Sequence, residues 1–470
     1  MPNTQKFINI ILAIDENGGI GLKNKLPWFI SDELKIFKQK TLNNTLIVGR
    51  KTLEELPLLL DRNIFCISKN FKSVRSKNRV VILFSNIEDA IEESLKLDKE
   101  VFVIGGNQIY NYVFQNLKSK YNFKVHISFI KNKFECDTFF DLKNLKDFYI
   151  TKKDDYELFT HYEMIYQQYG EQQYLDLIKN IIDNGERRTG RNGEIISDFC
   201  KHLKFDLRNG FPLLTTKKMF IKGIIEELLF FIRGDTNSKI LEEKGINIWK
   251  GNTSLEFLEK IGLHNVYKEG IMGPMYGYQW RYFNSPYDLT KFVPVNTGLN
   301  NNNFIDYPES GIDQLKNVID EIKNNPTSRR ILLTAYNPAQ ANNGVLYPCH
   351  SITIQFYVQD GYLDMFCYNR SSDCFHGIPF NIPSSALLLV IIAKITFLKP
   401  RYLNLTLGDA HIYSSHIEVA KKQLERIPYL FPKIELPEFT SLEEVEKLTF
   451  IDFKIVNYNY HPAIKADMIV

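Results

Sequence analysis

Residues 345–356 read VLYPCHSITIQF and place a single cysteine, Cys349, directly before a run in which apolar residues alternate with others. The alternation of Ile352, Ile354 and Phe356 predicts a β-strand with one buried face. Most isolated cysteines are small buried hydrophobic residues, so this is the default interpretation of Cys349. A reactive cysteine instead needs positive charge around its sulfur, and the rest of the sequence must supply that charge.

The composition is typical of a globular protein with more than one domain. At about 150 residues per domain, 470 residues predict two or three domains. A net charge of +3 gives no support for binding to nucleic acid or to a membrane surface. Six cysteines form no C-x-x-C pair, so we expect no metal and no disulfide framework. The longest wholly apolar run, 386–393, is too short to cross a bilayer, and we expect a cytoplasmic protein.

The order of apolar runs predicts two domains of different class. Residues 1–166 alternate short strands with helical patterns, which indicates an α/β sheet domain. A very short linker joins it to a larger α+β domain, residues 167–470, which carries an asparagine-rich surface insert at about 284–311. The strands expected in the first domain are 7–14, 45–48, 63–68, 79–84, 101–104 and 125–130.

A carboxylate in the first half falls on the buried side of a short predicted helix. In LPWFISDELKIF, residues 26–37, the apolar stripe formed by Ile30, Leu34 and Phe37 also includes Glu33. Most helical glutamates are solvated. A carboxylate among apolar side chains would be desolvated, and it could hold a proton or bind a 2-aminopyrimidine edge.

Glycines and basic residues at predicted strand ends suit a phosphorylated cofactor. In VIGGNQIY, residues 103–110, a strand runs into two glycines and a helix start, which leaves backbone N–H groups free to bind phosphate. The segments VGRKT, residues 48–52, and Ser68-Lys69 add cations suited to a 2′-phosphate. Each motif alone is equally compatible with a lysine-rich surface.

Together, these motifs resemble the dihydrofolate reductase family across 1–166, with A-I-D, L-P-W, D-E-L, V-G-R-K-T, V-I-G-G and D-T-F-F in order. The resemblance implies hydride transfer from NADPH to dihydrofolate, with Glu33 binding the pteridine and helping to protonate it. It implies that the folate site includes Ile11, Leu26, Trp28, Phe37, Arg62 and Ser128. It implies that the cofactor site includes Ala13, Gly49, Arg50, Lys51, Thr52, Ser68, Lys69, Gly105, Gly106 and Tyr110.

Arginines supply the positive charge that Cys349 would need. They occur in three clusters, ERRTG at 186–190, PTSRR at 326–330 and NRSSD at 369–373. Arginine pairs are usually surface residues. Three clusters beside polar turn residues in one domain favour a phosphate site, because the guanidinium fork matches phosphate oxygens.

Further polar residues of the second half suit a pyrimidine nucleotide. Asn381 begins a buried helix, where it could cap the helix or pair with the edge of uracil. His411 and Tyr413 would share one face of a strand. In the helix expected over 218–233, Glu227 lies on the apolar face and could relay protons, whereas Glu226 is predicted to face solvent.

These motifs resemble thymidylate synthase across about 168–470, above all Y-P-C-H, N-R-S-S-D, G-x-P-F-N and G-D-A-H-I-Y. The resemblance implies that Cys349 attacks dUMP, that 5,10-methylenetetrahydrofolate is the co-substrate, and that Glu227, Tyr276 and His350 assist proton transfer. It implies dUMP contacts from Arg188, Arg329, Arg330, Arg370, Ser371, Asn381, His411 and Tyr413. It implies folate contacts from Trp249, Asp373 and Val470.

The order of the halves resembles the bifunctional dihydrofolate reductase–thymidylate synthase family of protists and plants. That resemblance implies a homodimer in which Arg329 and Arg330 reach the partner's site. Lys250 and Ile271 stand where the synthase family usually has aspartate, and Asn369 where it has glutamine.

Two other functions are compatible with parts of this pattern. One is a pyrimidine-nucleotide hydroxymethylase on the same fold, although a cytosine-directed site should prefer an acidic residue to Asn381. The other is a catalytically silent protein that binds nucleotide, folate or RNA.

Overall fold

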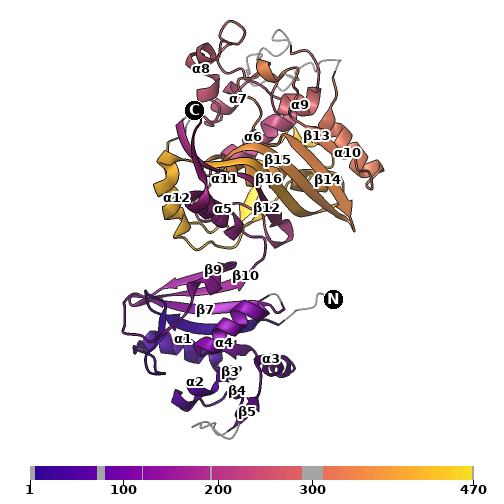
Figure 1. Cartoon of the computed structure of the whole chain (residues 1–470). Coiled ribbons are helices and arrows are strands. Elements are labelled where there is room, and N and C mark those ends of the chain that lie inside the picture. Colours follow the sequence, from indigo (N-terminus) through magenta and orange to yellow (C-terminus); the bar gives the residue numbers. More distant parts are fainter. Residues whose placement is uncertain (1–5, 71–79, 119, 191–192, 288–310, 468–470) are drawn as a thin grey trace. The chain divides into compact units, whose positions relative to one another are not determined.

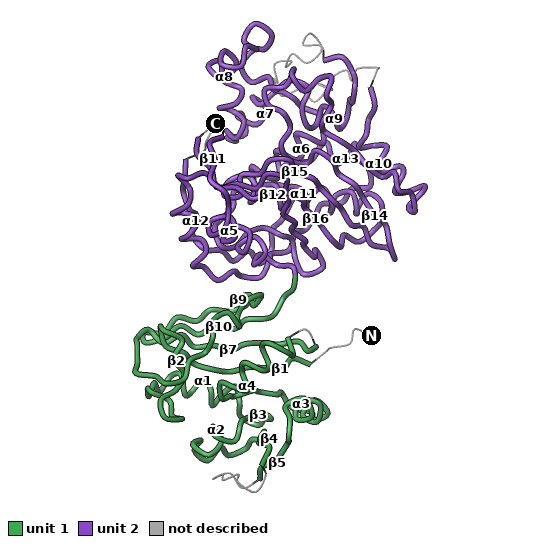
Figure 2. The backbone as a smooth tube through the Cα atoms, in the orientation of Figure 1, with its two compact units in different colours: residues 1–168 green, residues 169–470 purple. Residues whose placement is uncertain are grey.

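The computed structural model describes residues 6–70, 80–118, 120–190, 193–287 and 311–467. The chain forms two compact units, residues 1–168 and 169–470 (Figure 2). Most of the insert expected at 284–311 lies outside the described residues, and so does Val470.

Unit 1 is built on one eight-stranded sheet with the strand order β5-β4-β3-β6-β1-β7-β10-β9 (Figure 1). Pairing is parallel from β5 to β7 and antiparallel between β7, β10 and β9. In that order the strands are Val81–Phe84, Asn63–Ile67, Thr45–Gly49, Val101–Val103, Ile8–Ile14, Phe123–Ile130, Phe159–Tyr166 and Phe148–Asp155. The helices are α1 Ser31–Thr41, α2 Arg50–Glu55, α3 Ile87–Leu95 and α4 Asn107–Tyr112.

The strands predicted for unit 1 form, with ends that differ by up to two residues; residue 79, the predicted start of one of them, lies outside the described residues. β1 is buried along its whole length, because a parallel sheet is covered on both faces. This is why the central strands read as continuous apolar runs, and the predicted α/β class is confirmed.

Unit 2 is built on a six-stranded sheet with the order β11-β12-β16-β15-β14-β13, in which only β15 and β16 pair in parallel. In that order the strands are Glu186–Gly190, Gly193–Asp206, Lys399–Tyr413, Tyr362–Asp373, Thr353–Gln359 and Leu332–Thr334. The longer helices are α5 Gln172–Asn184, α6 Ile221–Arg233, α10 Gln314–Asn324, α11 Gly377–Ile395 and α12 Ile417–Leu424. The shorter ones are α7 Lys239–Glu242, α8 Leu255–Lys260, α9 Gly277–Tyr282 and α13 Leu442–Val445. The predicted α+β class is confirmed.

Two buried helices form the centre of unit 2. α11 packs against β15, β16 and α6, and it is apolar almost all round. It is long and apolar enough to cross a membrane, but most of it is buried within the protein, as in the core helix of a globular domain. α6 ends at Gly234, which adopts a left-handed conformation (φ 76°), as predicted.

The prediction that Glu226 faces solvent is wrong. Its side chain is 2% exposed, and the carboxylate binds Lys244 Nζ at 2.6 Å and accepts a hydrogen bond from the Phe450 N–H at 2.8 Å. The reason is that a C-terminal segment more than 200 residues away covers the face of α6 that the helical pattern assigns to water.

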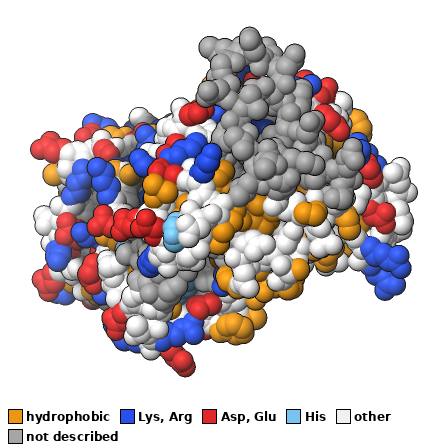
Figure 3. Space-filling view, turned by 90° about the horizontal axis from the view of Figure 1, so that it is seen from above, with side chains coloured by type: hydrophobic (Ala, Val, Ile, Leu, Met, Phe, Trp, Pro, Cys, Tyr) orange, Lys and Arg blue, Asp and Glu red, His pale blue; other side chains and the backbone are white. Residues whose placement is uncertain are grey.

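Acidic and basic side chains are interspersed over the face drawn in Figure 3. This distribution accords with the net charge of +3.

Candidate active sites

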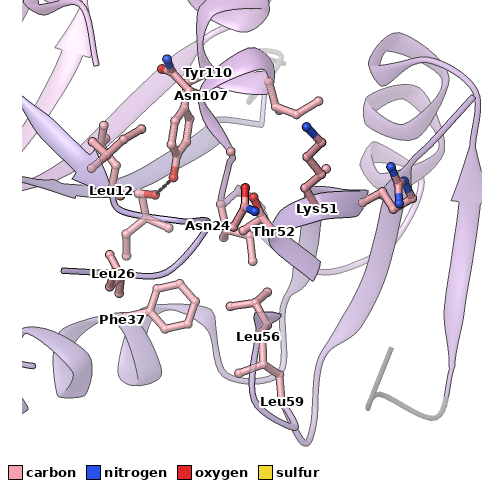
Figure 4. A pocket seen from close by; sticks show the side chains of 18 of the residues that line it. Leu12, Asn24, Leu26, Phe37, Lys51, Thr52, Leu56, Leu59, Asn107 and Tyr110 are labelled. Atoms are coloured by element: carbon pink, nitrogen blue, oxygen red, sulfur yellow. Dashed lines mark hydrogen bonds between the residues drawn. The ribbon is translucent and has the colours of Figure 1, made fainter. Parts of the chain in front are cut away.

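A cavity of about 1230 Å³ opens in unit 1 and gathers most of the residues predicted for the reductase. In Figure 4, Leu26, Phe37, Leu56 and Leu59 form an apolar wall, and Lys51 and Thr52 lie on another side. The predicted residues that line it are Ile11, Ala13, Leu26, Glu33, Phe37, Gly49, Arg50, Lys51, Thr52, Arg62, Ser68, Lys69, Gly106 and Tyr110.

Glu33 is the buried carboxylate of this cavity. It projects from α1 and is 6% exposed. Burial raises the pKa of Glu33 to about 7, and a hydrogen bond with Ser128 opposes part of that rise. A carboxyl group with this pKa can both hold and release a proton near neutral pH.

The glycines at the other side of the cavity leave room for a ligand close to the backbone. The Gly49 N–H donates to the Gly105 carbonyl at 2.7 Å, which holds the start of α2 against the β6–α4 turn. A Cβ atom on Gly106 would lie 2.7 Å from Thr52 Oγ1. Gly105 has a φ of +106°, which few residues other than glycine adopt. This is the cradle that a phosphorylated cofactor requires.

Tyr110 and Arg62 are fixed by hydrogen bonds at two edges of the cavity. The Tyr110 hydroxyl donates to the Ile11 carbonyl at 2.7 Å. The Arg62 guanidinium donates to Thr41 Oγ1 at 3.1 Å and to the carbonyls of Leu60 at 2.6 Å and Lys38 at 3.2 Å. Arg62 therefore has a fixed position in the lining of the cavity.

Three predicted residues lie behind the cavity wall. Ser128 contacts Glu33 from β7, and Gly105 contributes its carbonyl to the turn. Trp28 is buried against Phe134, with the ring centroids 5.3 Å apart. The apolar residues Leu56 and Leu59 were not predicted from the sequence, although both belong to the apolar run LPLLL, residues 56–60.

In unit 2, Cys349 lies against a buried tyrosine and histidine. The Tyr276 hydroxyl lies 3.4 Å from Cys349 Sγ and accepts a hydrogen bond from the Cys349 N–H at 3.1 Å. The Tyr276 ring stacks on His350, with centroids 4.6 Å apart. Burial lowers the pKa of His350 to about 4, so this ring is neutral at pH 7.

Arg370 and Ser371 are held beside the cysteine by the backbone. The Arg370 guanidinium donates to the carbonyls of Pro348 at 3.0 Å and Tyr347 at 3.1 Å, the two residues before Cys349. The Ser371 N–H donates to the Cys349 carbonyl at 3.4 Å. Cys349 is partly exposed. Cys349 is therefore not the fully buried cysteine of the default interpretation.

A second arginine is linked to the predicted ribose-binding residues. Arg188 binds the carboxylate of Asp409. The other oxygen of Asp409 lies 3.3 Å from His411 Nδ1, and the His411 and Tyr413 rings meet edge to face at 5.5 Å. Asp409 was not predicted, although it is the aspartate of the quoted G-D-A-H-I-Y motif.

Glu227 and Trp249 form a buried pair. The Trp249 indole N–H donates to Glu227 Oε1 at 2.8 Å. Burial raises the pKa of Glu227 to about 7, and this hydrogen bond opposes part of the rise. The predicted inward direction of Glu227 is observed, since its side chain is buried.

The remaining predicted residues lie at several points around these groups. Asp373 Oδ1 accepts the Phe375 and His376 N–H groups at 2.8 and 3.2 Å, and Asn381 lies in the first turns of α11. Arg329 and Arg330 are exposed between α10 and β13.

The three departures from the synthase pattern have different surroundings. Asn369 is fully buried, and its Oδ1 accepts the Ser351 N–H at 2.8 Å, so it supports the segment that follows Cys349. Ile271 is buried in the core, whereas Lys250 is exposed.

The comparisons with known proteins cover both units. The dihydrofolate reductase family matches residues 7–171, and the thymidylate synthase family matches residues 172–470. A bifunctional dihydrofolate reductase-thymidylate synthase of Paramecium tetraurelia is 38% identical, over 99% of this chain and 100% of its own length. Another, from Zea mays, is 35% identical, over 99% of this chain and 97% of its own. Thymidylate synthase 1/2 of Encephalitozoon cuniculi is 42% identical over 63% of this chain.

Proposed function

Because this chain belongs to the family of bifunctional dihydrofolate reductase–thymidylate synthases, we propose that the residues described above divide the two reactions between the two units. The protein acts in dTMP biosynthesis: unit 2 methylates dUMP and releases dihydrofolate, and unit 1 reduces dihydrofolate to tetrahydrofolate. NADPH supplies the hydride to unit 1, and 5,10-methylenetetrahydrofolate supplies both the carbon and the hydride to unit 2, which is why it leaves as dihydrofolate. A hydroxymethylase or a silent binding protein is not favoured by these relatives.

In the reductase, Glu33 is the group that binds and protonates the pteridine. Its burial beside apolar side chains and its pKa of about 7 support this role. The glycine cradle at Gly105-Gly106, with Lys51 and Thr52, would hold the cofactor phosphates. Trp28 would act from behind the wall by packing, because it does not line the cavity.

In the synthase, the surroundings of Cys349 carry the proposal. The thiolate forms a bond with C6 of the uracil ring, which makes C5 nucleophilic toward the carbon donor. Arg370 is tied to the two carbonyls that precede the cysteine, so one residue can bind the substrate phosphate and keep the sulfur in a positive environment. Glu227, Tyr276 and His350 would move protons at the ring.

The other predicted contacts complete the substrate sites. Asn381 would bind the uracil edge, and Asp373 and Trp249 would bind the folate. The phosphate would be bound by Arg188 and Ser371 together with Arg370, and the ribose by His411 and Tyr413.

We further propose a homodimer that forms through the open face of the unit 2 sheet. The register places Leu332, Tyr357 and Phe366 on one face of β13, β14 and β15, and all three are exposed in the single chain. An exposed apolar sheet face next to Arg329 and Arg330 supports a partner that covers the face and receives these arginines. All six cysteines are free thiols, which supports the proposed cytoplasmic location.

A complementation experiment tests the crossed arginines. Chains with Cys349→Ala and chains with Arg329→Ala are each expected to lack synthase activity. Mixed in equal amounts after dissociation, they should regain up to roughly a quarter of the wild-type activity, because about half of the dimers are heterodimers and each of these has one intact site out of two. Full activity of Arg329→Ala alone, or a monomer by sedimentation, would contradict the proposal.

The division of labour has its own test. Cys349→Ala should abolish dTMP formation and leave dihydrofolate-dependent NADPH oxidation unchanged, and Glu33→Ala should do the reverse. Loss of both activities from a folded single variant would show that the two units do not work as proposed.

A further inference from the structure

Two buried histidines and a glutamate form a cluster on the sheet of unit 1, outside the substrate cavity. His126 on β7 is opposite Glu163 on β10, and Ser128 is opposite His161 in the same pair of strands. Because positions two apart on a strand share a face, these side chains point the same way. One donor atom from each of His126, His161 and Glu163 lies within 4.8 Å of the others.

Hydrogen bonds fix which nitrogen of each ring is free. Asn9 Nδ2 donates to the Val101 carbonyl at 3.3 Å, so Asn9 Oδ1 is the acceptor that faces His126 Nε2 at 3.1 Å. His126 therefore carries its proton on Nε2 and presents a lone pair at Nδ1. That lone pair faces Glu163 Oε1 at 3.8 Å, an acceptor opposite an acceptor.

The second ring has the same arrangement. Because Ser128 Oγ donates to the Glu33 carboxylate, it accepts a hydrogen bond from His161 Nδ1 at 3.0 Å, and the lone pair of His161 Nε2 has no hydrogen-bond partner among the described residues. His126 Nδ1 also lacks one. The two side chains are 3% and 2% exposed, and burial lowers the pKa of each imidazole, so both rings are neutral.

We propose that His126 Nδ1, His161 Nε2 and the Glu163 carboxylate bind a divalent transition-metal ion such as Zn²⁺. Two neutral imidazoles and a carboxylate are a usual ligand set for such an ion, and each ring is oriented through its other nitrogen, as metal-bound histidines are. Zinc ligands about 2.0–2.1 Å from the ion lie roughly 3–4 Å from one another. The donor atoms of the three side chains, which lie within 4.8 Å of one another, would therefore have to approach by about 1 Å when the ion binds. The ion is not required by either reaction proposed above.

Two lysines compete with the ion for the carboxylate. Lys40 Nζ lies 2.7 Å from Glu163 Oε1, and Lys124 Nζ lies 2.5 Å from Oε2. The Lys40 side chain is 25% exposed, so it can turn toward water when an ion enters. A second cavity of about 400 Å³, lined by Lys40, Lys124 and His126, gives the ion a route.

Titration of the whole chain with Co²⁺, followed by visible absorbance and equilibrium dialysis, tests the proposal. One ion should bind per chain, and His126→Gln, His161→Gln and Glu163→Gln should each weaken binding at least tenfold. His264→Gln, which removes an exposed histidine of unit 2, is the matched control and should have no effect. Lys40→Gln should strengthen binding by roughly tenfold, because it removes a competing cation.

The results separate a metal site from a site that holds only water. The proposal is overturned if wild-type protein does not bind Co²⁺ below roughly millimolar concentration. It is also overturned if the three variants bind Co²⁺ as tightly as wild type does. Circular dichroism and dihydrofolate reduction check that the variants fold. Should they not fold, anomalous diffraction from wild-type crystals soaked in Co²⁺ decides the matter by the presence or absence of a peak between the three side chains.

Discussion

Removing the Ser128 hydroxyl should raise the pKa of Glu33 and extend reductase activity to higher pH. Glu33 already titrates at about 7 because it is buried, and its hydrogen bond with Ser128 favours the ionised form. A hydrogen bond to a charged group contributes about 1.5–3 kcal/mol, and part of this persists in the protonated state. At 1.36 kcal/mol per tenfold change in proton affinity, Ser128→Ala should therefore raise the pKa by roughly 1, to roughly 8.

The effect on the rate follows from the role of Glu33 as proton donor. At pH 8 a group with a pKa of about 7 is roughly 10% protonated, whereas one with a pKa of roughly 8 is half protonated. When the rate of each enzyme at pH 8 is divided by its own maximal rate at low pH, the value for Ser128→Ala should be roughly fivefold higher than the value for wild type. The assay is the pH profile of dihydrofolate-dependent NADPH oxidation, read as the midpoint of its basic limb.

A matched control separates this effect from loss of a buried hydroxyl. Ser94 is also fully buried, but its hydroxyl donates to the Ile91 carbonyl at 2.8 Å, and Ser94 does not line the cavity. Ser94→Ala should leave the midpoint unchanged. An unchanged or lowered midpoint in Ser128→Ala would refute the reasoning, whatever happened to the maximal rate.

Two further predictions concern Glu227 of unit 2 and Gly106 of unit 1. Glu227 has a folded pKa of about 7 against 4.5 for the free side chain, so its contribution to stability is present below pH 4.5 and is lost as pH rises through 7. Glu227→Gln should therefore raise the melting temperature of unit 2 more at pH 8 than at pH 5, and the difference should correspond to about 3 kcal/mol of unfolding free energy at most. The same substitution should reduce dTMP formation. Calorimetry that showed the same change in melting temperature at both pH values would contradict this prediction. Gly106→Ala puts a Cβ atom 2.7 Å from Thr52 Oγ1 and should raise the KM for NADPH by at least tenfold. In the control variant Gly190→Ala, the new Cβ atom lies 3.6 Å from its nearest neighbour, and the KM should not change. Equal KM values for the two variants would argue against the proposed phosphate cradle.

The spacing of apolar residues correctly predicted those features of the two sites that depend on a single helix or strand. Glu33 lies on the apolar stripe of a helix, and Ile352, Ile354 and Phe356 alternate along a strand, so the sequence alone predicts their burial. These predictions hold because the spacing of side chains on a helix or strand does not depend on the rest of the fold.

What could not be predicted depends on residues distant in the sequence. The misassigned Glu226 is covered by a segment that begins near Phe450, and no pattern within α6 reports on that contact. Arg188 on β11 and Asp409 on β16 are 221 residues apart, and their strands come together because β12 pairs with both. The histidine cluster of unit 1 also arises from strand pairing, since His126 and His161 belong to no quoted motif.

The two sites use the same physical means on unrelated folds. In each site, burial raises the pKa of a helical glutamate to about 7. One neutral hydrogen-bond donor limits the rise, and this donor is Ser128 for Glu33 and Trp249 for Glu227. The donor matters because burial alone would keep the carboxyl protonated to higher pH and move its titration away from neutrality. Since dihydrofolate leaves one site and is consumed at the other, both sites must work at one pH. Two similarly balanced carboxyl groups meet that requirement without any contact between the units.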